Sequence, residues 1–166
     1  MPFGELLEQH RVHLDLVTIH RERLTSSQVS GVVRQFSKQL VLLEVVGETG
    51  LAGGFALIRR EDVTRIDRNT ERLRQSLKRL GIVPKNHPIA RELDLNEWRS
   101  AITSAQTIAP SLRLHREGVG DPMILASGTI KLLKHLVIGE HPDPSVSDEG
   151  EFALLLLDHL TRVDLT

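Results

Sequence analysis

The sequence predicts a mainly β protein made of two tandem five-stranded small barrels, each preceded by a short helix. The tripeptide His-Arg-Glu occurs at 20–22 and again at 115–117. Three pairs of identical residues are separated by the same 97 positions: Gly31 and Gly128, Phe55 and Phe152, and Arg65 and Arg162. Both halves contain short segments rich in β-branched and apolar residues, separated by Ser, Gly or charged turns. We therefore expect one structural unit that occurs twice.

The size of the chain indicates that two such units need further contacts. A single body of 166 residues buries roughly 70% of the surface of its unfolded chain, whereas a unit of about 65 residues buries nearer 60%. The composition, 40% hydrophobic and 26% charged, is that of a globular protein. We expect the units to pack against each other or against other copies.

The first unit begins with a helical candidate at 4–11, GELLEQHR. Five short strand candidates follow, at 17–24, 29–37, 39–46, 54–61 and 63–67. Five strands within about 50 residues favour a small, strongly bent barrel. Gly31 lies inside the second strand, where a glycine often marks a bulge or a sharp bend.

A helix and a linker connect the units. Leu73, Leu77 and Leu80 have helical spacing and Gly81 is a natural stop. The segment 82–90 cannot continue this helix because it contains two prolines. We predict a first barrel with its trailing helix at 1–81, a linker at 82–93, and a second barrel with a leading helix at 94–166.

The second unit repeats the first in the same order. Its leading helix is expected at 94–106, where Asp94 or Asn96 can cap the first turn. The segments that match strands of the first unit are ASGTIKLLKHLVIGEHP at 126–142 and GEFALLLLDHLTRVD at 150–164.

A helix followed by five bent strands, with an apolar-glycine pair in the second strand, resembles the Sm/LSm-like small barrel, one of the SH3-like barrels. VSGVVRQFSKQLVLL and FALIRREDVTRI are similar to its two signature regions, and the resemblance covers about 13–67 and, more weakly, 112–164. RNA-binding members of that family carry Asp and Asn after the second strand and Arg-Gly near the fifth. Here those places read FSKQLV and LLKHLV, then RRED and LLDH. The resemblance therefore implies the fold and ring assembly more than an RNA site.

The repeated His-Arg-Glu segments are interpreted as structural. Alternation along a strand places His20 and Glu22 on one face and Arg21 on the other. Arg21 is then expected to pair with a neighbouring strand or with Asp67. The same interpretation applies to the second copy, with Arg116 and Asp164.

No constellation in the sequence predicts catalysis, a cofactor or a metal. There is no cysteine, and the eight histidines are scattered, with His10, His13 and Asp15 as the closest group. The glycine-rich segment 47–54 lacks the Gly-Lys-Ser/Thr ending of a phosphate loop and is predicted to be a hairpin loop. No Gly-x-Ser-x-Gly elbow occurs. We therefore expect a protein that is not an enzyme.

Positive charge concentrates in the first half. Residues 1–81 contain 13 Lys and Arg against 10 Asp and Glu, whereas residues 82–166 contain 8 against 12. The candidate nucleic-acid-binding residues belong to one basic run: Arg65, Arg68, Arg72, Lys78 and Arg79. On a helix, most of these would lie on one side. Aromatic residues that could stack on bases are scarce, with no Tyr and one Trp, and Phe36, Phe55 and Phe152 are predicted core positions.

The sequence thus predicts a non-catalytic binding or assembly module that forms a homo-oligomer through the edge strands of its barrels. RNA binding by the basic run is the alternative. The longest apolar run, at 152–157, is far shorter than the roughly 20 residues of a membrane span. Glu5 and Glu8 interrupt the amino-terminal segment, so no secretory signal is expected. We expect a cytoplasmic protein of bacterial type.

Overall fold

A computed structural model describes residues 2–24, 28–46, 52–68, 75, 78–79, 88–118, 123–140 and 152–166. The first half contains α1 (Phe3–His13), β1 (Leu16–His20), β2 (Gln28–Phe36), β3 (Leu40–Val46), β4 (Ala52–Arg59), η1 (Arg60–Asp62) and β5 (Arg65–Arg68). The second half contains α3 (Ile89–Glu92), α4 (Trp98–Ile108), β6 (Leu112–Arg116), β7 (Met123–Leu132), β8 (Leu136–Glu140), β9 (Phe152–Leu156), η2 (Leu157–His159) and β10 (Arg162–Leu165). The predicted mainly β class with short helices is confirmed.

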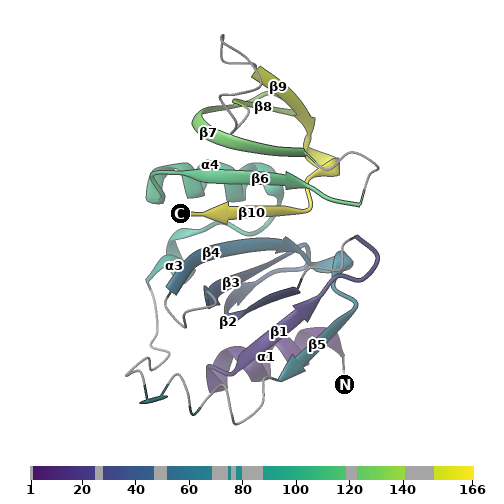
Figure 1. Cartoon of the computed structure of the whole chain (residues 1–166), viewed down its shortest axis with the longest axis vertical. Helices are drawn as coiled ribbons and strands as arrows, with labels where there is room; N and C mark the ends of the chain where they lie inside the picture. Colours follow the sequence, from purple (N-terminus) through teal and green to yellow (C-terminus); the bar gives the residue numbers. More distant parts are fainter. Residues whose placement is uncertain are drawn as a thin grey trace.

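The strands pair antiparallel in the order β5-β1-β2-β3-β4-β10-β6-β7-β8-β9 (Figure 1). This order contains the same five-strand arrangement twice, because β10 and β6 to β9 pair as β5 and β1 to β4 do. A 3-10 turn precedes the last strand of each set. The two predicted five-stranded barrels are not seen as closed barrels: among the described strands β5 pairs only with β1 and β9 only with β8, so neither set closes.

Both predicted leading helices form, with different boundaries. The backbone N–H of Leu14, which has a left-handed conformation at φ 52°, helps to end α1. The predicted caps of α4, Asp94 and Asn96, are wrong. Glu97 caps this helix instead, in a capping box with Ser100. The reason is register: α4 begins at Trp98, which leaves Glu97 three residues before Ser100.

Gly31 explains how closely β2 and β3 approach each other. It lies opposite Val45, and a Cβ atom at this position would be 2.2 Å from the backbone oxygen of Glu44. No other residue type fits this place without a shift of the backbone. The prediction that Gly31 marks an irregular point of the strand agrees with the register shift that follows between Val33 and Gln35.

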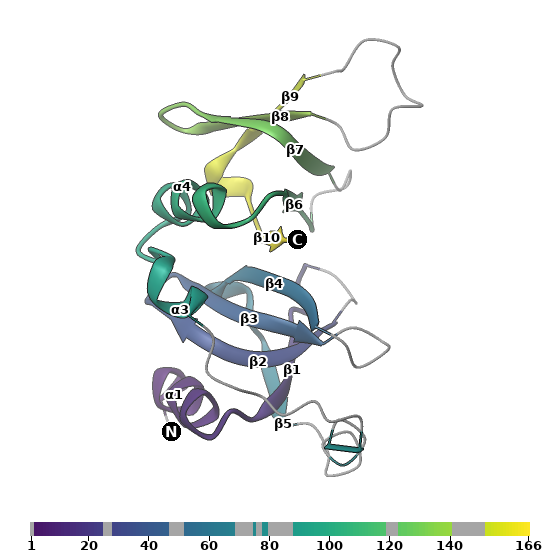
Figure 2. The ribbon, with the colours of Figure 1, turned by 90° about the vertical axis from the view of Figure 1, so that its left-hand side faces the viewer.

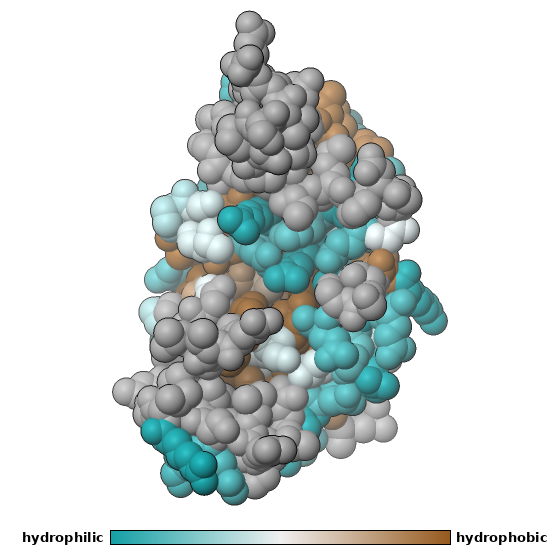
Figure 3. All heavy atoms as spheres, viewed as in Figure 1, coloured by the Kyte–Doolittle hydropathy of each residue, from teal (hydrophilic) through white to brown (hydrophobic). Residues whose placement is uncertain are grey.

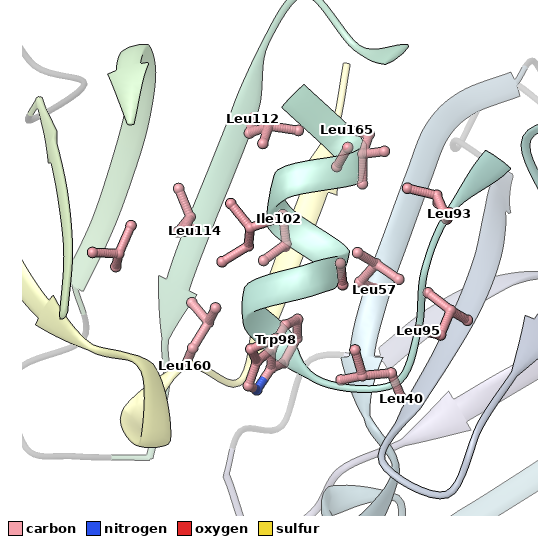
Figure 4. Packing of buried hydrophobic residues seen from close by; sticks show 14 of the residues in the cluster. Leu40, Leu57, Leu93, Leu95, Trp98, Ile102, Leu112, Leu114, Leu160 and Leu165 are labelled. Carbon is pink, nitrogen blue, oxygen red and sulfur yellow. The ribbon is translucent and has the colours of Figure 1, made fainter. Parts of the chain in front are cut away.

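Three hydrophobic cores form among the described residues; one of them spans both sets of strands, and the smallest consists of Leu16 and Val32. The first core lies under α1 and contains Leu7, Val17, Ile19 and further buried residues of β2 to β4. The second core combines residues of α4, β6, β8, β9 and β10 with residues of the first half: Leu40, Leu42 and Leu57. Figure 4 shows Trp98 and Ile102 on α4 between these two groups. Both α1 and α4 lie on the same side of the strands (Figure 2).

The connection between the two sets contributes to the second core. Within the predicted linker, Ile89 and Leu93 are buried and the short helix α3 forms. Of the predicted helix before it, Gln75, Lys78 and Arg79 are helical and exposed, and the other residues lie outside the described ranges. None of the helices in the described ranges combines the length and the apolar character that a membrane crossing requires.

Candidate assembly interface

The two sets of strands meet where β4 pairs with β10, and this contact is called the seam. Figure 1 shows β4 and β10 side by side. Leu57 lies opposite Val163, and Phe55 lies opposite Leu165. Gly54, at φ +85°, makes the close approach possible, because a Cβ atom there would be 2.4 Å from the backbone oxygen of Leu165. The seam therefore joins the fourth strand of the first set to the fifth strand of the second.

A buried ion pair crosses the seam between the two His-Arg-Glu segments. The guanidinium of Arg21, which is fully buried, donates hydrogen bonds to both carboxylate oxygens of Glu117. The side chain of Glu117 is 14% exposed, and the hydroxyl of Thr161 donates a further hydrogen bond to it at 2.9 Å. Arg21 of the first repeat is thus bound to the glutamate of the second.

Arg59, the last residue of β4, makes a second set of polar contacts across the seam. Its Nη2 donates to the backbone oxygen of Asp158 at 2.5 Å and to that of Leu160. The carboxylate of Asp62 lies 3.8 Å from Nε of Arg59. Burial raises the pKa of Asp62, although the charges of Arg59 and Arg21 act in the opposite direction.

The histidines and aspartates of the repeats form the same contact in each set. The ring of His20 donates from Nε2 to Asp67 at 2.8 Å, and that of His115 donates to Asp164 at 2.9 Å. In the first set the hydroxyl of Thr64 also donates to the backbone oxygen of His20 at 3.1 Å, and in the second set the hydroxyl of Thr161 lies 3.0 Å from the backbone oxygen of His115. The structure therefore repeats at atomic level as well as in strand order.

These contacts correct the prediction for the His-Arg-Glu segments. A structural ion pair involving Arg21 is confirmed, but its partner is Glu117 and not Asp67. The predicted alternation fails because β1 ends at His20, so that Arg21 and Glu22 follow the strand and leave its face. The aspartate of the last strand is bound instead by the histidine of the tripeptide and by the arginine two residues before the aspartate, Arg65 in the first set and Arg162 in the second.

Two carboxyl groups near the seam are held in their charged form. Burial alone would raise the pKa of Glu117, but the hydrogen bonds and charge of Arg21, with help from Thr161, lower it below its ordinary value. The pKa of Asp164 is lowered in the same way, against its burial, by the hydrogen bond from His115 and by Arg162.

The lowered pKa of Glu117 predicts a loss of stability in acid. A carboxyl group with a lowered pKa in the folded state contributes stability that is present above its unfolded pKa and is lost as the pH falls through the folded value. We expect the free energy of unfolding to decrease below pH 4.5, the ordinary value for Glu117. Glu117→Gln is expected to be much less stable at neutral pH and to approach the wild type as the pH falls.

Urea unfolding at a series of pH values measures this difference. The matched control is Glu8→Gln, because Glu8 also has a lowered pKa from an arginine hydrogen bond but is exposed. Stability curves of Glu117→Gln and the wild type that stayed parallel down to acid pH would contradict the expectation.

Two edge strands have only one partner each among the described strands: β5 and β9. On β10, in the seam, Arg162 and Asp164 are 20% and 17% exposed at their side chains. The equivalent Arg65 and Asp67 on β5 are 55% and 49% exposed.

A leucine of β9 is likewise more exposed than its equivalent on β4. Leu154 is 59% exposed, whereas the equivalent Leu57 on β4 is fully buried. Figure 3 shows hydrophobic side chains at the surface over β9. Both strands thus leave exposed what their counterparts bury in the seam.

Of the basic run, Arg65 and Arg68 do not lie on the predicted helix. Arg65 and Arg68 lie in β5, where an odd separation places their side chains on opposite faces of the strand. Arg65 is near Asp67 and Glu22, and Arg68 binds Asp15 at 2.9 Å.

The structure describes two of the other three candidate residues of the run. Lys78 and Arg79 are helical and exposed, and Arg72 lies outside the described residues. Most of the predicted hairpin loop, 47–51, is also outside them, although the pairing of Val46 with Ala52 agrees with a β3–β4 hairpin. Phe36 and Phe55 pack partly buried against the cores, as predicted, and the side chain of Phe152 is not described.

Another polar contact of the first half is the buried pair of His10 and Asp15, 3.1 Å apart. The carboxylate of Asp15 also accepts a hydrogen bond from Arg68, so each of its two oxygens is bound by a side chain of the same chain. In the described part of the chain no group of three or more acidic, histidine or cysteine side chains has a geometry suited to a metal.

Comparison of the chain with protein-family models, with curated proteins and with solved structures found no match.

Proposed function

We propose that this protein is a non-catalytic assembly module, built from two open small barrels of the Sm type, that associates with further copies through its edge strands. One observation carries the proposal: the chain already contains one such contact, the seam between β4 and β10, while the two equivalent strands β9 and β5 lie at the ends of the strand order. Self-association would extend a contact for which the fold is already built.

The physical reason is the cost of exposed strand edges. An edge strand presents unpaired backbone N–H and C=O groups, and proteins normally blunt such edges with charges, bulges or a covering element. On β5 the charges of Arg65, Asp67 and Arg68 serve this purpose in the single chain. β9 carries the sequence Phe-Ala-Leu-Leu-Leu with Leu154 exposed, which is better suited to a partner than to water.

The repeated strand order supports the barrel type. Each set places its fifth strand beside its first and leaves its fourth strand at the other edge. The close approach at Gly31 and the register shift between Val33 and Gln35 fit the bend that a small barrel requires. This combination is what the resemblance to Sm-like barrels implies.

The alternative partner is RNA, bound by Arg65, Arg68, Arg72, Lys78 and Arg79. Exposure of the described cations favours it, but Arg65 and Arg68 are already paired with carboxylates. Each such pair reduces the charge that a phosphate would meet. Assembly is therefore the better supported function.

The mass of the full chain in solution, measured by light scattering, tests the proposal. We expect an oligomer at low and at high salt whose mass is unchanged by a pool of short single-stranded RNA. A monomer throughout the accessible concentration range would refute the assembly function. A mass that increases only with RNA, and only at low salt, would replace it by the RNA-binding alternative.

A further inference from the structure

We infer that copies of this chain join head to tail: β9 of one copy pairs with β5 of the next, and Arg116 of the first copy forms an ion pair with Glu22 of the second. This arrangement rests on the proposed assembly function and gives it a polarity, a register and a partner for each surface. The contact is heterologous, since two different surfaces of the chain meet.

The seam is the template for this contact. There the fourth strand of one set, β4, pairs with the fifth strand of the following set, β10. β9 is the fourth strand of the second set, and β5 is the fifth strand of the first. Transferring the register places Leu154 opposite Ile66 of the next copy, as Leu57 lies opposite Val163 in the seam.

The apolar face beside β9 supports the same polarity. In the first set, Leu42 and Leu57 lie opposite each other on β3 and β4 and are both fully buried. In the second set, Ile138 and Leu154 have the same register on β8 and β9. Leu154 is 59% exposed there, although its equivalent shares a core cluster with residues of α4.

The helix of a following copy can cover this face. In the seam, Trp98 and Ala101 on α4 belong to the core cluster that buries Leu57. Figure 4 shows Trp98 and Leu57 within this cluster. The spacing of 95 residues that relates His20 to His115 relates these two positions to Phe3 and Leu6 on α1. Phe3 and Leu6 are only partly buried in the single chain, and they supply the apolar surface that Leu154 lacks.

The repeated glutamates explain the ion pair. Across the seam the arginine of the first repeat, Arg21, binds the glutamate of the second, Glu117. At a β9–β5 contact the second set takes the place of the first, so Arg116 takes the role of Arg21 and Glu22 of the next copy takes that of Glu117. The side chain of Glu22 is 60% exposed and thus accessible to a partner.

Three positions make the contact between copies different from the seam. Leu156 occupies the place of Arg59, Arg68 occupies that of Leu165, and Arg23 occupies that of Gly118. At one end of the seam, Phe55 lies opposite the apolar Leu165. At the equivalent place between copies, Phe152 would lie opposite the charged Arg68. We expect the contact between copies to be weaker than the seam and to depend on concentration.

Charge reversal in the full chain tests the polarity. Glu22→Arg and Arg116→Glu are each expected to raise the apparent dissociation constant by more than about tenfold, because each places like charges at the contact. A mixture of the two single variants, or the double variant, is expected to restore the wild-type mass, because every contact again joins opposite charges. Light scattering over a range of concentrations measures all four.

Leu154→Lys provides a second test that does not depend on Arg116, and it is also expected to weaken association by more than about tenfold. Its control is Val12→Lys, because Val12 is equally exposed but lies on the part of α1 that the transferred contact leaves in solvent.

A wild-type oligomer that is indifferent to Leu154→Lys and to both charge reversals would overturn the head-to-tail arrangement while leaving the assembly function intact. Single variants that dissociate without rescue in the mixture or the double variant would also overturn it, because a contact of β9 with β9, or β5 with β5, predicts that result. A monomeric wild type would refute the assembly function itself.

Discussion

Arg21→Met is expected to lower the free energy of unfolding by about 3–5 kcal/mol, the usual cost of removing one partner from a buried ion pair. Arg21 is fully buried and binds both oxygens of Glu117, whose side chain is 14% exposed. Without Arg21 the carboxylate of Glu117 would remain in the seam beside the half-buried carboxyl of Asp62, and it would lose the hydrogen bonds and the charge that offset its lost hydration. Urea unfolding measured at neutral pH tests this.

Arg11→Met is the matched control. Arg11 also binds a glutamate through two nitrogens, at 2.8 and 2.6 Å from Glu8, but both side chains are exposed and lie on one helix. We expect a change close to the scatter of the measurement, because water screens such pairs. Adding Glu117→Leu to Arg21→Met should recover much of the lost stability, since it removes the unpaired charge. Equal losses for Arg21→Met and Arg11→Met would show that the buried pair does not stabilise the seam.

Leu57→Ala and Leu154→Ala are expected to differ strongly although the two positions are equivalent in the repeat. Leu57 is fully buried in the core cluster that spans the seam, so its truncation should cost about 2–5 kcal/mol, from lost burial and the cavity left behind. Leu154 is 59% exposed, so the same change should cost under about 1 kcal/mol in a single chain. Urea unfolding of both variants measures the difference.

The comparison requires conditions in which association does not contribute. Both variants should be measured at a concentration low enough to keep the wild type monomeric, because binding between folded copies adds to apparent stability. At higher concentration, Leu154→Ala should lose more of the added stability than its small effect on the single chain accounts for. Similar losses for the two variants in the dilute sample would mean that Leu57 is not stabilised by the second half of the chain.

Much of the architecture can be predicted from the sequence because it depends on local patterns and on repetition. The strand candidates of the first half fall on the observed strands, since alternating apolar segments between turn residues form strands in almost any context. The spacing of 97 residues predicts that the two halves have the same order of elements, and they do. The helix boundaries were less predictable: α4 begins at Trp98 because the Glu97 and Ser100 side chains complete its first turn.

The candidate interface was only partly predictable. The repeated tripeptide pointed to Arg21 as an ion-pair residue but not to its partner, because the partner lies 96 positions away on the other set of strands. The role of Arg59 could not be predicted from the sequence, because a single arginine at a strand end has no distinctive pattern. Its partners, the backbone oxygens of Asp158 and Leu160, come close only in the folded chain. The basic run is continuous along the chain, but β5 places the side chains of Arg65 and Arg68 on opposite faces of a strand.

The sequence by itself determined that this protein is mainly β and that one unit occurs twice, and it pointed to Gly31 as a bulge or bend in the second strand of the unit. Those properties follow from residue types and their spacing along the chain. Only the tertiary structure decided which edges meet, because backbone groups of any two antiparallel strands can pair and the choice depends on which side chains become buried together. Leu57 and Leu154 have equivalent places in the repeat, but one is enclosed by the second half of the chain and the other is left at the surface.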